Sequence, residues 1–264
     1  MITADEIRRI ARAQELAVGI VEKDYALTWL LRGFYSRSSP LKNSLVLKGG
    51  TAIRKTYFPE TWRFSEDLDF TVIGNKEADK VKGSMQRIFG LLLSASGLSY
   101  SIDSFHPTEG SIIANVRFLG PLNFPNRIKH DITLNEKMVL KPVRRPVKSS
   151  YPDIPRFNIL AYSLTEILVE KVRSIMQRGY SRDYYDVWKL MKENKFRDAR
   201  IKKLLVKKCE LNGIKYQPRL LFNRRRLSAA RSFWQRGLGH LTRELPSFEA
   251  VVSELRGKLS FLQE

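Results

Sequence analysis

Two short motifs in the first third of the chain constrain its fold more than any other feature. The first, Gly49-Gly50-Thr51, follows the apolar run Ser44–Leu47, which is typical of a short buried strand, and it precedes a helix start. Two adjacent glycines let the backbone approach a ligand closely, and the unpaired N–H groups of a helix start bind phosphate oxygens. This junction predicts a cradle for a polyphosphate, to which the side chains of Thr51, Arg54 and Lys55 would add donors.

The second motif is a strand with two acids. From Asp67 to Val72 apolar residues alternate with others, so Asp67 and Asp69 share the face opposite the core. Neighbouring carboxylates repel unless a hard divalent cation such as Mg²⁺ joins them, with nucleotide phosphates completing its oxygen shell. An isolated Asp-x-Asp is more often a solvated strand face. The upstream glycines and the nearby Ser65, a further phosphate donor, favour the metal-binding interpretation here.

A third acid, Asp131, lies on another predicted strand. Between Arg127 and Leu134 the alternation places Lys129, Asp131 and Thr133 on one face and His130 on the other. A third carboxylate on a neighbouring strand could share metal ions and help deprotonate or orient an attacking hydroxyl. The alternative is an ordinary exposed strand acid. His130 is predicted to be a packed core residue.

The second half of the chain contributes Lys171 and Asp183. Ser163-Leu164-Thr165-Glu166 predicts a capping box that opens a helix running to about Arg178. Lys171 falls within its apolar stripe, so its stem either extends to solvent or its ammonium reaches an anion such as a triphosphate. Asp183 follows Ser181, a predicted N-cap, and is either a first-turn acid favoured by the helix dipole or a site residue.

Taken together, these motifs resemble a known family. The chain is similar, over roughly residues 20 to 190, to the AbiEii/AbiGii-type nucleotidyltransferase toxins of the polymerase-beta-like superfamily. The residues that carry the resemblance are Lys48-Gly49-Gly50-Thr51, Arg63-x-Ser65-x-Asp67-x-Asp69, the strand around Asp131, Glu170-Lys171, Arg182-Asp183 and, less specifically, Glu22-Lys23-Asp24-Tyr25.

The resemblance implies a toxin of a type IV toxin-antitoxin pair, with a cognate antitoxin as partner. It also implies transfer of nucleotides from an NTP, in some members to tRNA ends. It assigns Lys171 to phosphate binding and places Asp183 beside it.

Length and composition limit where in the cell such a protein can be expected. The chain has 264 residues, and no apolar run is long enough to span a bilayer. Residues 1–6 are typical of a helix cap and not of a signal peptide. A single cysteine, Cys209, excludes an internal disulfide and fits a reducing compartment, so we expect a cytoplasmic protein without membrane contact.

Charge predicts a polyanionic partner. The formal net charge is +20, from 47 basic and 27 acidic residues, and such a field favours nucleic acid. Any one basic cluster is usually a solvated surface, but their sum points to RNA as the acceptor, and the family resemblance suggests tRNA. The clusters are Lys141–Arg145, Lys202-Lys203 with Lys207-Lys208, and Arg224–Arg226 with Arg231 and Arg236.

The expected fold is α+β. A mixed sheet with flanking helices, as in polymerase-beta-like nucleotidyltransferases, would occupy residues 1–150, and a mostly helical half would occupy residues 151–264. A Pro-rich, basic connector from Pro142 to Pro155 suggests a division near residue 150. Carboxylates from the sheet and Lys171 with Asp183 from the helices would then meet in a cleft.

The sequence therefore predicts a Mg²⁺-dependent enzyme that transfers NMP from an NTP to an acceptor hydroxyl, most directly an RNA such as a tRNA 3′ end. Catalysis is assigned to Asp67, Asp69, Asp131, Lys171 and Asp183, the metal to the first three, and nucleotide binding to Gly49, Gly50, Thr51, Arg54, Ser65 and Lys171. Two alternatives stay open: an enzyme that modifies a protein side chain, and a nucleic-acid-binding regulator without turnover.

Overall fold

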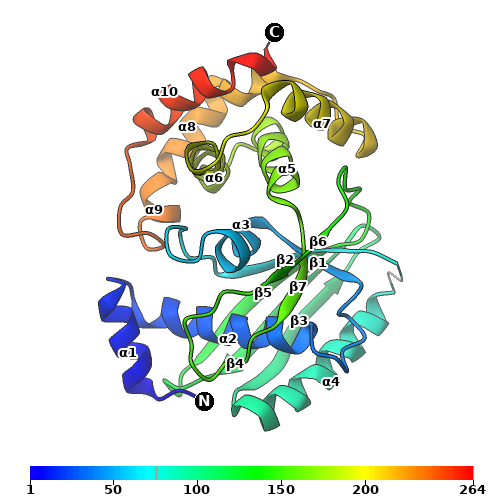
Figure 1. Ribbon diagram of the computed structural model, residues 1–264, viewed down its shortest axis with the longest axis vertical. Helices are drawn as coiled ribbons and strands as arrows, with labels where there is room; N and C mark the ends of the chain where they lie inside the picture. The colour runs from blue at the N-terminus through cyan, green and yellow to red at the C-terminus, as the bar shows by residue number, and fades with distance from the viewer. Residues whose placement is uncertain (75–76, 264) are drawn as a thin grey trace. The chain divides into compact units, whose positions relative to one another are not determined.

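The computed structural model describes residues 1–74 and 77–263, which form two compact units (Figure 1). The first, here called the sheet unit, comprises Met1–Glu136 and Pro142–Tyr162. The second, here called the helical unit, comprises Lys137–Lys141 and Ser163–Glu264. The predicted fold class is confirmed, because a mixed sheet with helices is followed by a mostly helical half.

The sheet unit is built on seven strands. These are β1 (Leu45–Lys48), β2 (Asp67–Val72), β3 (Ser99–Pro107), β4 (Ser111–Leu119), β5 (Pro125–Thr133), β6 (Val143–Pro146) and β7 (Asn158–Ala161). They form one sheet in the order β3-β4-β5-β2-β1-β7-β6. β2 is parallel to β5 and β1 is parallel to β7, while the other neighbours are antiparallel. The strands with the acidic motifs therefore lie next to each other near the middle of the sheet.

Helical segments complete the sheet unit. They are α1 (Ala4–Ala13), α2 (Val18–Phe34), α3 (Gly49–Ala52), the π-helical turn η1 (Ile53–Tyr57) and α4 (Ala78–Ser96), of which α2 and α4 pack on the apolar face of the sheet. α2 contacts β5 and α4, and α4 contacts β3, as Figure 1 also shows. Buried strand residues such as Phe70, Ile128 and Ile132 form the core here, each stabilising the fold by roughly 1.5–3 kcal/mol. The same alternation leaves charged and hydroxyl side chains on the opposite face of the strands.

The helix starts follow local sequence. Thr3 and Glu6 form the predicted cap of α1, since the Thr3 hydroxyl accepts from the Glu6 N–H and the Glu6 carboxylate accepts from the Thr3 N–H. At the other end of the unit, Gly97 adopts φ 74° and closes α4 in the left-handed conformation that glycine tolerates.

The helical unit consists of short helices packed on one another. They are α5 (Leu164–Gln177), α6 (Ser181–Glu193), α7 (Asp198–Leu211), the 3₁₀ turn η2 (Pro218–Phe222), α8 (Arg224–Ser232), α9 (Trp234–Leu238), α10 (Phe248–Lys258) and the 3₁₀ turn η3 (Ser260–Leu262). α5 packs against α6 and α7, and the rings of Tyr185, Trp234 and Phe248 join α6, α9 and α10. The chain turns between η2, α8 and α9, because Asn223 caps the start of α8 and Phe233 ends it.

The Pro-rich, basic segment from Pro142 to Pro155, expected to be a connector, contains a strand. The strand β6 lies within it, and β6 pairs with β7, which extends the sheet through the pairing of Ala161 with Leu47. The division between the units therefore follows Tyr162, whereas the sequence placed it near residue 150. Pro146 is compatible with β6 because this strand lies at the sheet edge.

The segment Lys137–Lys141 belongs to the helical unit because of Glu166. The Glu166 carboxylate accepts from the N–H groups of Val139 (3.0 Å) and Leu140 (2.8 Å) and pairs with Lys208 (3.0 Å). Ser163 caps α5 as predicted, but the Glu166 side chain is drawn to these partners, so the full capping box was not formed. Over the described ranges, no helix has the length and apolar character needed to cross a membrane.

Candidate active site

One row of side chains crosses three strands on the polar face of the sheet. Lys48 in β1 is the register partner of Asp69 in β2, and Asp69 is the register partner of Asp131 in β5. Directly paired residues project from the same face, and neighbouring strands lie about 4.7–4.9 Å apart. The structure thus brings Asp69 and Asp131 together from segments far apart in the sequence.

Asp67 lies one row further along the same face. It is the register partner of Lys129, and its carbonyl oxygen accepts a hydrogen bond from the Thr51 hydroxyl (2.6 Å). Within the part of the chain that the structure describes, no three acidic, histidine or cysteine side chains gather into a cluster that could hold a metal ion. The site is therefore a carboxylate pair, Asp69 and Asp131, with a third acid beside it. Hard oxygen donors of this kind suit Mg²⁺ when phosphate oxygens complete the shell.

The Gly49-Gly50 turn lies against Asp69 and against the Arg63 and Ser65 side chains that precede the acidic strand. Gly49 adopts φ +69°, and a Cβ atom there would come within 2.4 Å of the Asp69 carboxylate oxygen. A Cβ atom on Gly50 would lie 2.9 Å from an Arg63 guanidinium nitrogen and 3.3 Å from the Ser65 hydroxyl. Gly49 needs to be glycine, because its φ is strained for other residues and a side chain there would displace the Asp69 carboxylate, whereas a side chain at Gly50 would require the Arg63 guanidinium to move.

The three side-chain donors predicted beside the glycines have protein partners. Besides Thr51, which binds Asp67, Lys55 donates to the Asp24 carboxylate (2.7 Å) and Arg54 donates to the Trp62 carbonyl oxygen (2.7 Å). The Arg54 guanidinium also lies over the Phe64 ring, 3.4 Å from its centroid. These contacts hold the segment that leads into Ser65 and Asp67, so the three residues shape the site in this structure.

The motif Glu22-Lys23-Asp24-Tyr25 ties α2 to four other segments. The Glu22 carboxylate accepts from the Leu122 N–H (2.7 Å), Lys23 pairs with Glu66 (3.4 Å), and the Tyr25 hydroxyl donates to Asp153 (2.5 Å). Asp24 binds Lys55 and lies 3.7 Å from the Arg54 guanidinium. The motif therefore joins α2 to the rest of the sheet unit.

Lys48 and Arg63 lie beside the acidic row and the glycine turn, although the sequence analysis assigned them no separate role. Both residues are parts of the two motifs, and both are buried. Asp24 supports the site indirectly, because it holds Arg54 and Lys55. These placements depend on strand register and tertiary pairing, which local sequence patterns do not reveal.

Lys171 and Asp183 are neighbours in the helical unit. The Lys171 ammonium lies 3.0 Å from a carboxylate oxygen of Asp183 and 3.0 Å from one of Asp186. Arg178 also reaches Asp183 (3.2 Å). Asp186 is fully buried and is a partner of Lys171. Ser181 is the first residue of α6, and the N-cap is Tyr180 without a side-chain cap bond.

His130 is the packed core histidine that the alternation predicts. It is fully buried, and its ring meets the Phe34 ring edge to face. Burial lowers its pKa to about 4, although a hydrogen bond with the Ile128 carbonyl oxygen opposes this shift. The histidine is therefore neutral at physiological pH and has a structural role.

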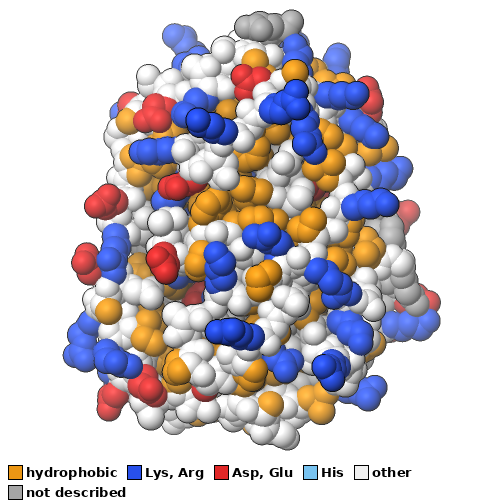
Figure 2. Space-filling view, in the orientation of Figure 1, with side chains coloured by type: hydrophobic (Ala, Val, Ile, Leu, Met, Phe, Trp, Pro, Cys, Tyr) orange, Lys and Arg blue, Asp and Glu red, His pale blue; other side chains and the backbone are white. Residues whose placement is uncertain are grey.

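The basic surface is broad, but one residue of the predicted clusters, Lys208, is buried and does not contribute to it. Figure 2 shows Lys and Arg side chains over the whole visible face, with fewer Asp and Glu side chains between them. Lys208 is fully buried against Glu166, and Arg226 donates to the carbonyl oxygens of Ile175 and Met176 near the end of α5. Lys208 stabilises the fold, because a buried cation needs such partners.

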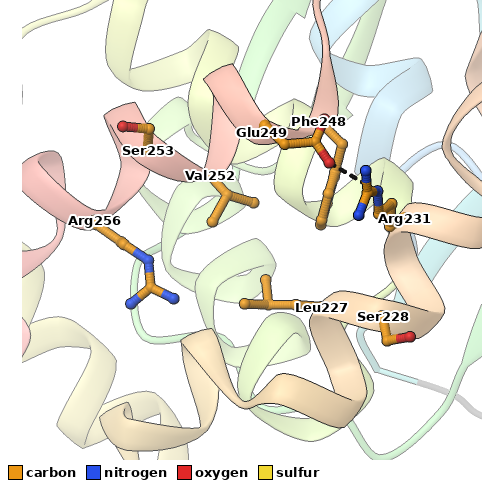
Figure 3. Close-up of a pocket in the computed structure, with 8 residues that line it drawn as sticks. All are labelled: Leu227, Ser228, Arg231, Phe248, Glu249, Val252, Ser253 and Arg256. Carbon is orange, nitrogen blue, oxygen red and sulfur yellow. Dashed lines mark ion pairs between the residues drawn. The ribbon is translucent and has the colours of Figure 1, made fainter.

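A hollow on the helical unit lies between α8 and α10 (Figure 3). Its apolar lining comes from Leu227, Phe248 and Val252, and Arg231 at its rim pairs with Glu249 (2.8 Å). None of the motif residues lines it, so it is separate from the acidic row.

A mixed sheet that carries paired carboxylates beside a glycine turn defines a nucleotidyltransferase. The family model of the AbiEii nucleotidyl transferase toxins of type IV toxin-antitoxin systems matches residues 29–254, and the chain belongs to this family. The resemblance inferred from the motifs is confirmed.

The fold is also found in a solved structure, MenT4, a nucleotidyltransferase toxin of Mycobacterium tuberculosis H37Rv. The two chains are 19% identical, and the match has a TM-score of 0.73 and covers 100% of this chain and 90% of that one. No curated protein matches the sequence.

Proposed function

We propose that this toxin-family protein transfers NMP from an NTP to a hydroxyl group of RNA, most directly a tRNA 3′ end. The observation that supports the proposal most is the pairing of Asp69 with Asp131 on the polar sheet face, beside the Gly49 turn. The net charge of +20 favours RNA over a protein side chain as the acceptor.

The residues present suit a divalent cation, since the donor set is carboxylate oxygen only. Mg²⁺, when bound by Asp69 and Asp131 with Asp67 beside them, would supply charge neutralisation for the triphosphate. The backbone at Gly49 and Gly50, with Ser65 and Arg63, holds the phosphates in this proposal. Most of the rate acceleration then comes from positioning and from electrostatic stabilisation.

The reaction is an in-line displacement. The acceptor oxygen forms a bond to the α-phosphorus, the bond from that phosphorus to the bridging β-phosphate oxygen breaks, and pyrophosphate leaves. Asp131 takes the proton of the acceptor hydroxyl. For Lys171 we retain the proposed role of countering charge on the leaving pyrophosphate, with Asp183 and Asp186 holding its ammonium in place.

The test uses α-³²P-labelled NTPs, Mg²⁺ and total tRNA, with the mass of the product read afterwards. We expect Asp69→Asn and Asp131→Asn each to lower the transfer rate by about a hundredfold or more while the protein stays folded. Asp5→Asn, an exposed acid at the start of α1, is the matched control and should transfer at the normal rate. Undiminished labelling of RNA by both site variants would show that the acid pair is not the catalytic centre.

The same labelling distinguishes the alternatives. Incubation with a cell lysate followed by gel separation shows whether RNA or protein carries the label. A regulator without turnover would bind RNA in a salt-sensitive manner and release no pyrophosphate. Labelled protein with unlabelled RNA would overturn the choice of acceptor but not the assignment of the acid pair.

A further inference from the structure

Lys48 places a buried positive charge in the same row as the acid pair. It ends β1, its register partner is Asp69, and the next residue across the sheet is Asp131. Its side chain therefore projects from the face that carries both carboxylates. Only 7% of its surface is exposed.

The ammonium of Lys48 extends across the row. It donates a hydrogen bond to the hydroxyl of Thr133 (3.0 Å), which lies in β5 two residues after Asp131. Because β2 lies between β1 and β5, the lysine side chain spans the strand that carries Asp69. A neutral hydroxyl fixes the position of an ammonium but does not balance its charge, and burying a charge is costly without an opposite charge nearby.

The two acids, Asp69 and Asp131, need a positive charge between or beside them, because their carboxylates repel each other. Like charges placed directly opposite each other on neighbouring strands destabilise a sheet. Asp69 and Asp131 occupy that arrangement, and both are partly buried. A cation in the same row relieves this repulsion, and a divalent ion bound to the pair would then be repelled by that same cation.

We propose that Lys48 is a resident counter-ion: it holds the Asp69–Asp131 pair in the metal-free protein and keeps the affinity of this pair for a free divalent ion low. Metal binding is then coupled to the nucleotide, whose phosphates bring additional negative charge and oxygen ligands. Lys48 acts through the carboxylates, so it is a positioning residue. The inference rests on the proposed function, because it takes the pair to be the metal site.

The test measures Mn²⁺ binding to the full-length protein without nucleotide, by the decrease of the free Mn²⁺ signal in electron paramagnetic resonance. We expect Lys48→Met to bind Mn²⁺ about tenfold more tightly than the unmodified protein, because a cation beside the site is removed. Lys48→Arg keeps the charge and should bind as the unmodified protein does. Lys42→Met, at a half-buried lysine that donates to the Arg37 carbonyl oxygen, is the control and should leave Mn²⁺ affinity unchanged.

A second readout is thermal unfolding. Metal-free Lys48→Met should melt at a lower temperature than the unmodified protein, and Mn²⁺ should raise its melting temperature by more. If Lys48→Met does not fold, Lys48→Gln, which keeps a donor for Thr133 and removes the charge, takes its place. An unchanged Mn²⁺ affinity in the charge-removing variant overturns the inference.

Asp69→Asn separates this inference from the function it rests on. If Asp69→Asn loses Mn²⁺ binding while Lys48→Met binds like the unmodified protein, the metal site stands and the counter-ion role fails. If Asp69→Asn binds Mn²⁺ as the unmodified protein does, and the double variant with Lys48→Met binds as Lys48→Met alone does, the acid pair is not the metal site.

Discussion

At the scale of a single residue, Asp24 is a buried carboxylate held by several partners. Its oxygens lie 2.7 Å from the Lys55 ammonium, 2.8 Å from the Tyr151 hydroxyl and 3.7 Å from the Arg54 guanidinium. Burial alone would raise the pKa of Asp24, but Lys55 and Arg54 together outweigh burial and hold the pKa below its ordinary value. Asp24 thereby fixes Arg54, which supports the segment leading to the acidic strand.

We predict that Asp24→Asn lowers the free energy of unfolding by about 3–5 kcal/mol at neutral pH, because two buried cations lose their anion. Urea unfolding of the full chain measures this change. The control is Asp5→Asn, whose side chain is 91% exposed, and it should change the free energy of unfolding by less than about 0.5 kcal/mol.

The pH dependence of the Asp24 contribution has a definite sign. The folded pKa lies below the unfolded one, so the contribution is complete above the unfolded pKa of about 4 and is lost as the pH falls through the folded value. The difference in stability between the unmodified protein and Asp24→Asn should therefore shrink on acidification below about pH 4. A difference that stays constant down to about pH 2 would contradict this account.

At the scale of elements, α7 carries two adjacent lysines with opposite environments. Lys207 is exposed, whereas Lys208 is fully buried and holds Glu166 of α5 at 3.0 Å. The Lys208 ammonium also donates to the Lys137 carbonyl oxygen (3.0 Å), so it joins α7, α5 and the segment Lys137–Lys141. One lysine is available to a polyanion, and the other is part of the core.

We predict that Lys208→Met destabilises the helical unit by about 3–5 kcal/mol, because a buried carboxylate loses its cation. Lys207→Met is the matched control and should leave stability within about 0.5 kcal/mol. Thermal unfolding followed by circular dichroism compares the two variants. Equal melting temperatures would mean that the buried pair contributes no net stability.

Local patterns in the sequence predicted most elements but not the complete sheet. Strands β2 and β5 were predicted because each alternates over six or more residues, with apolar residues on one face. Strands β6 and β7 were missed because each has four residues and they lie in or just after a Pro-rich segment. What defines β7 is its parallel pairing with β1, a long-range contact that carries no local signal.

The arrangement of the site, like the complete sheet, could be predicted only in part from local sequence patterns. Alternation predicted which face Asp67, Asp69 and Asp131 would occupy, yet the direct pairing of Asp69 with Asp131 depends on strand order and register. The partners of Thr51, Arg54 and Lys55 were not predictable, because burial of a cation beside a distant acid leaves no local pattern. Residue type suggested the chemistry, and topology determines which groups meet.

At the scale of the whole molecule, the net charge of +20 makes a prediction that is independent of catalysis. If six to ten phosphates are neutralised, the affinity for tRNA should fall by about 10³–10⁵ between roughly 50 and 200 mM salt. We expect Arg224 and Arg225, exposed at the start of α8, to contact tRNA phosphates. We predict that Arg224→Gln combined with Arg225→Gln reduces the slope of log affinity against log salt by about 1 per arginine that contacts phosphate.

Asp69→Asn is the matched comparison for this measurement, because it alters the acidic row and keeps the basic surface. Its tRNA affinity and salt slope should equal or slightly exceed those of the unmodified protein, since a negative charge is removed. Filter binding at several salt concentrations gives both values. A salt-independent affinity, or binding lost in Asp69→Asn but kept in the double arginine variant, would show that the acidic row and not the basic surface governs RNA recognition.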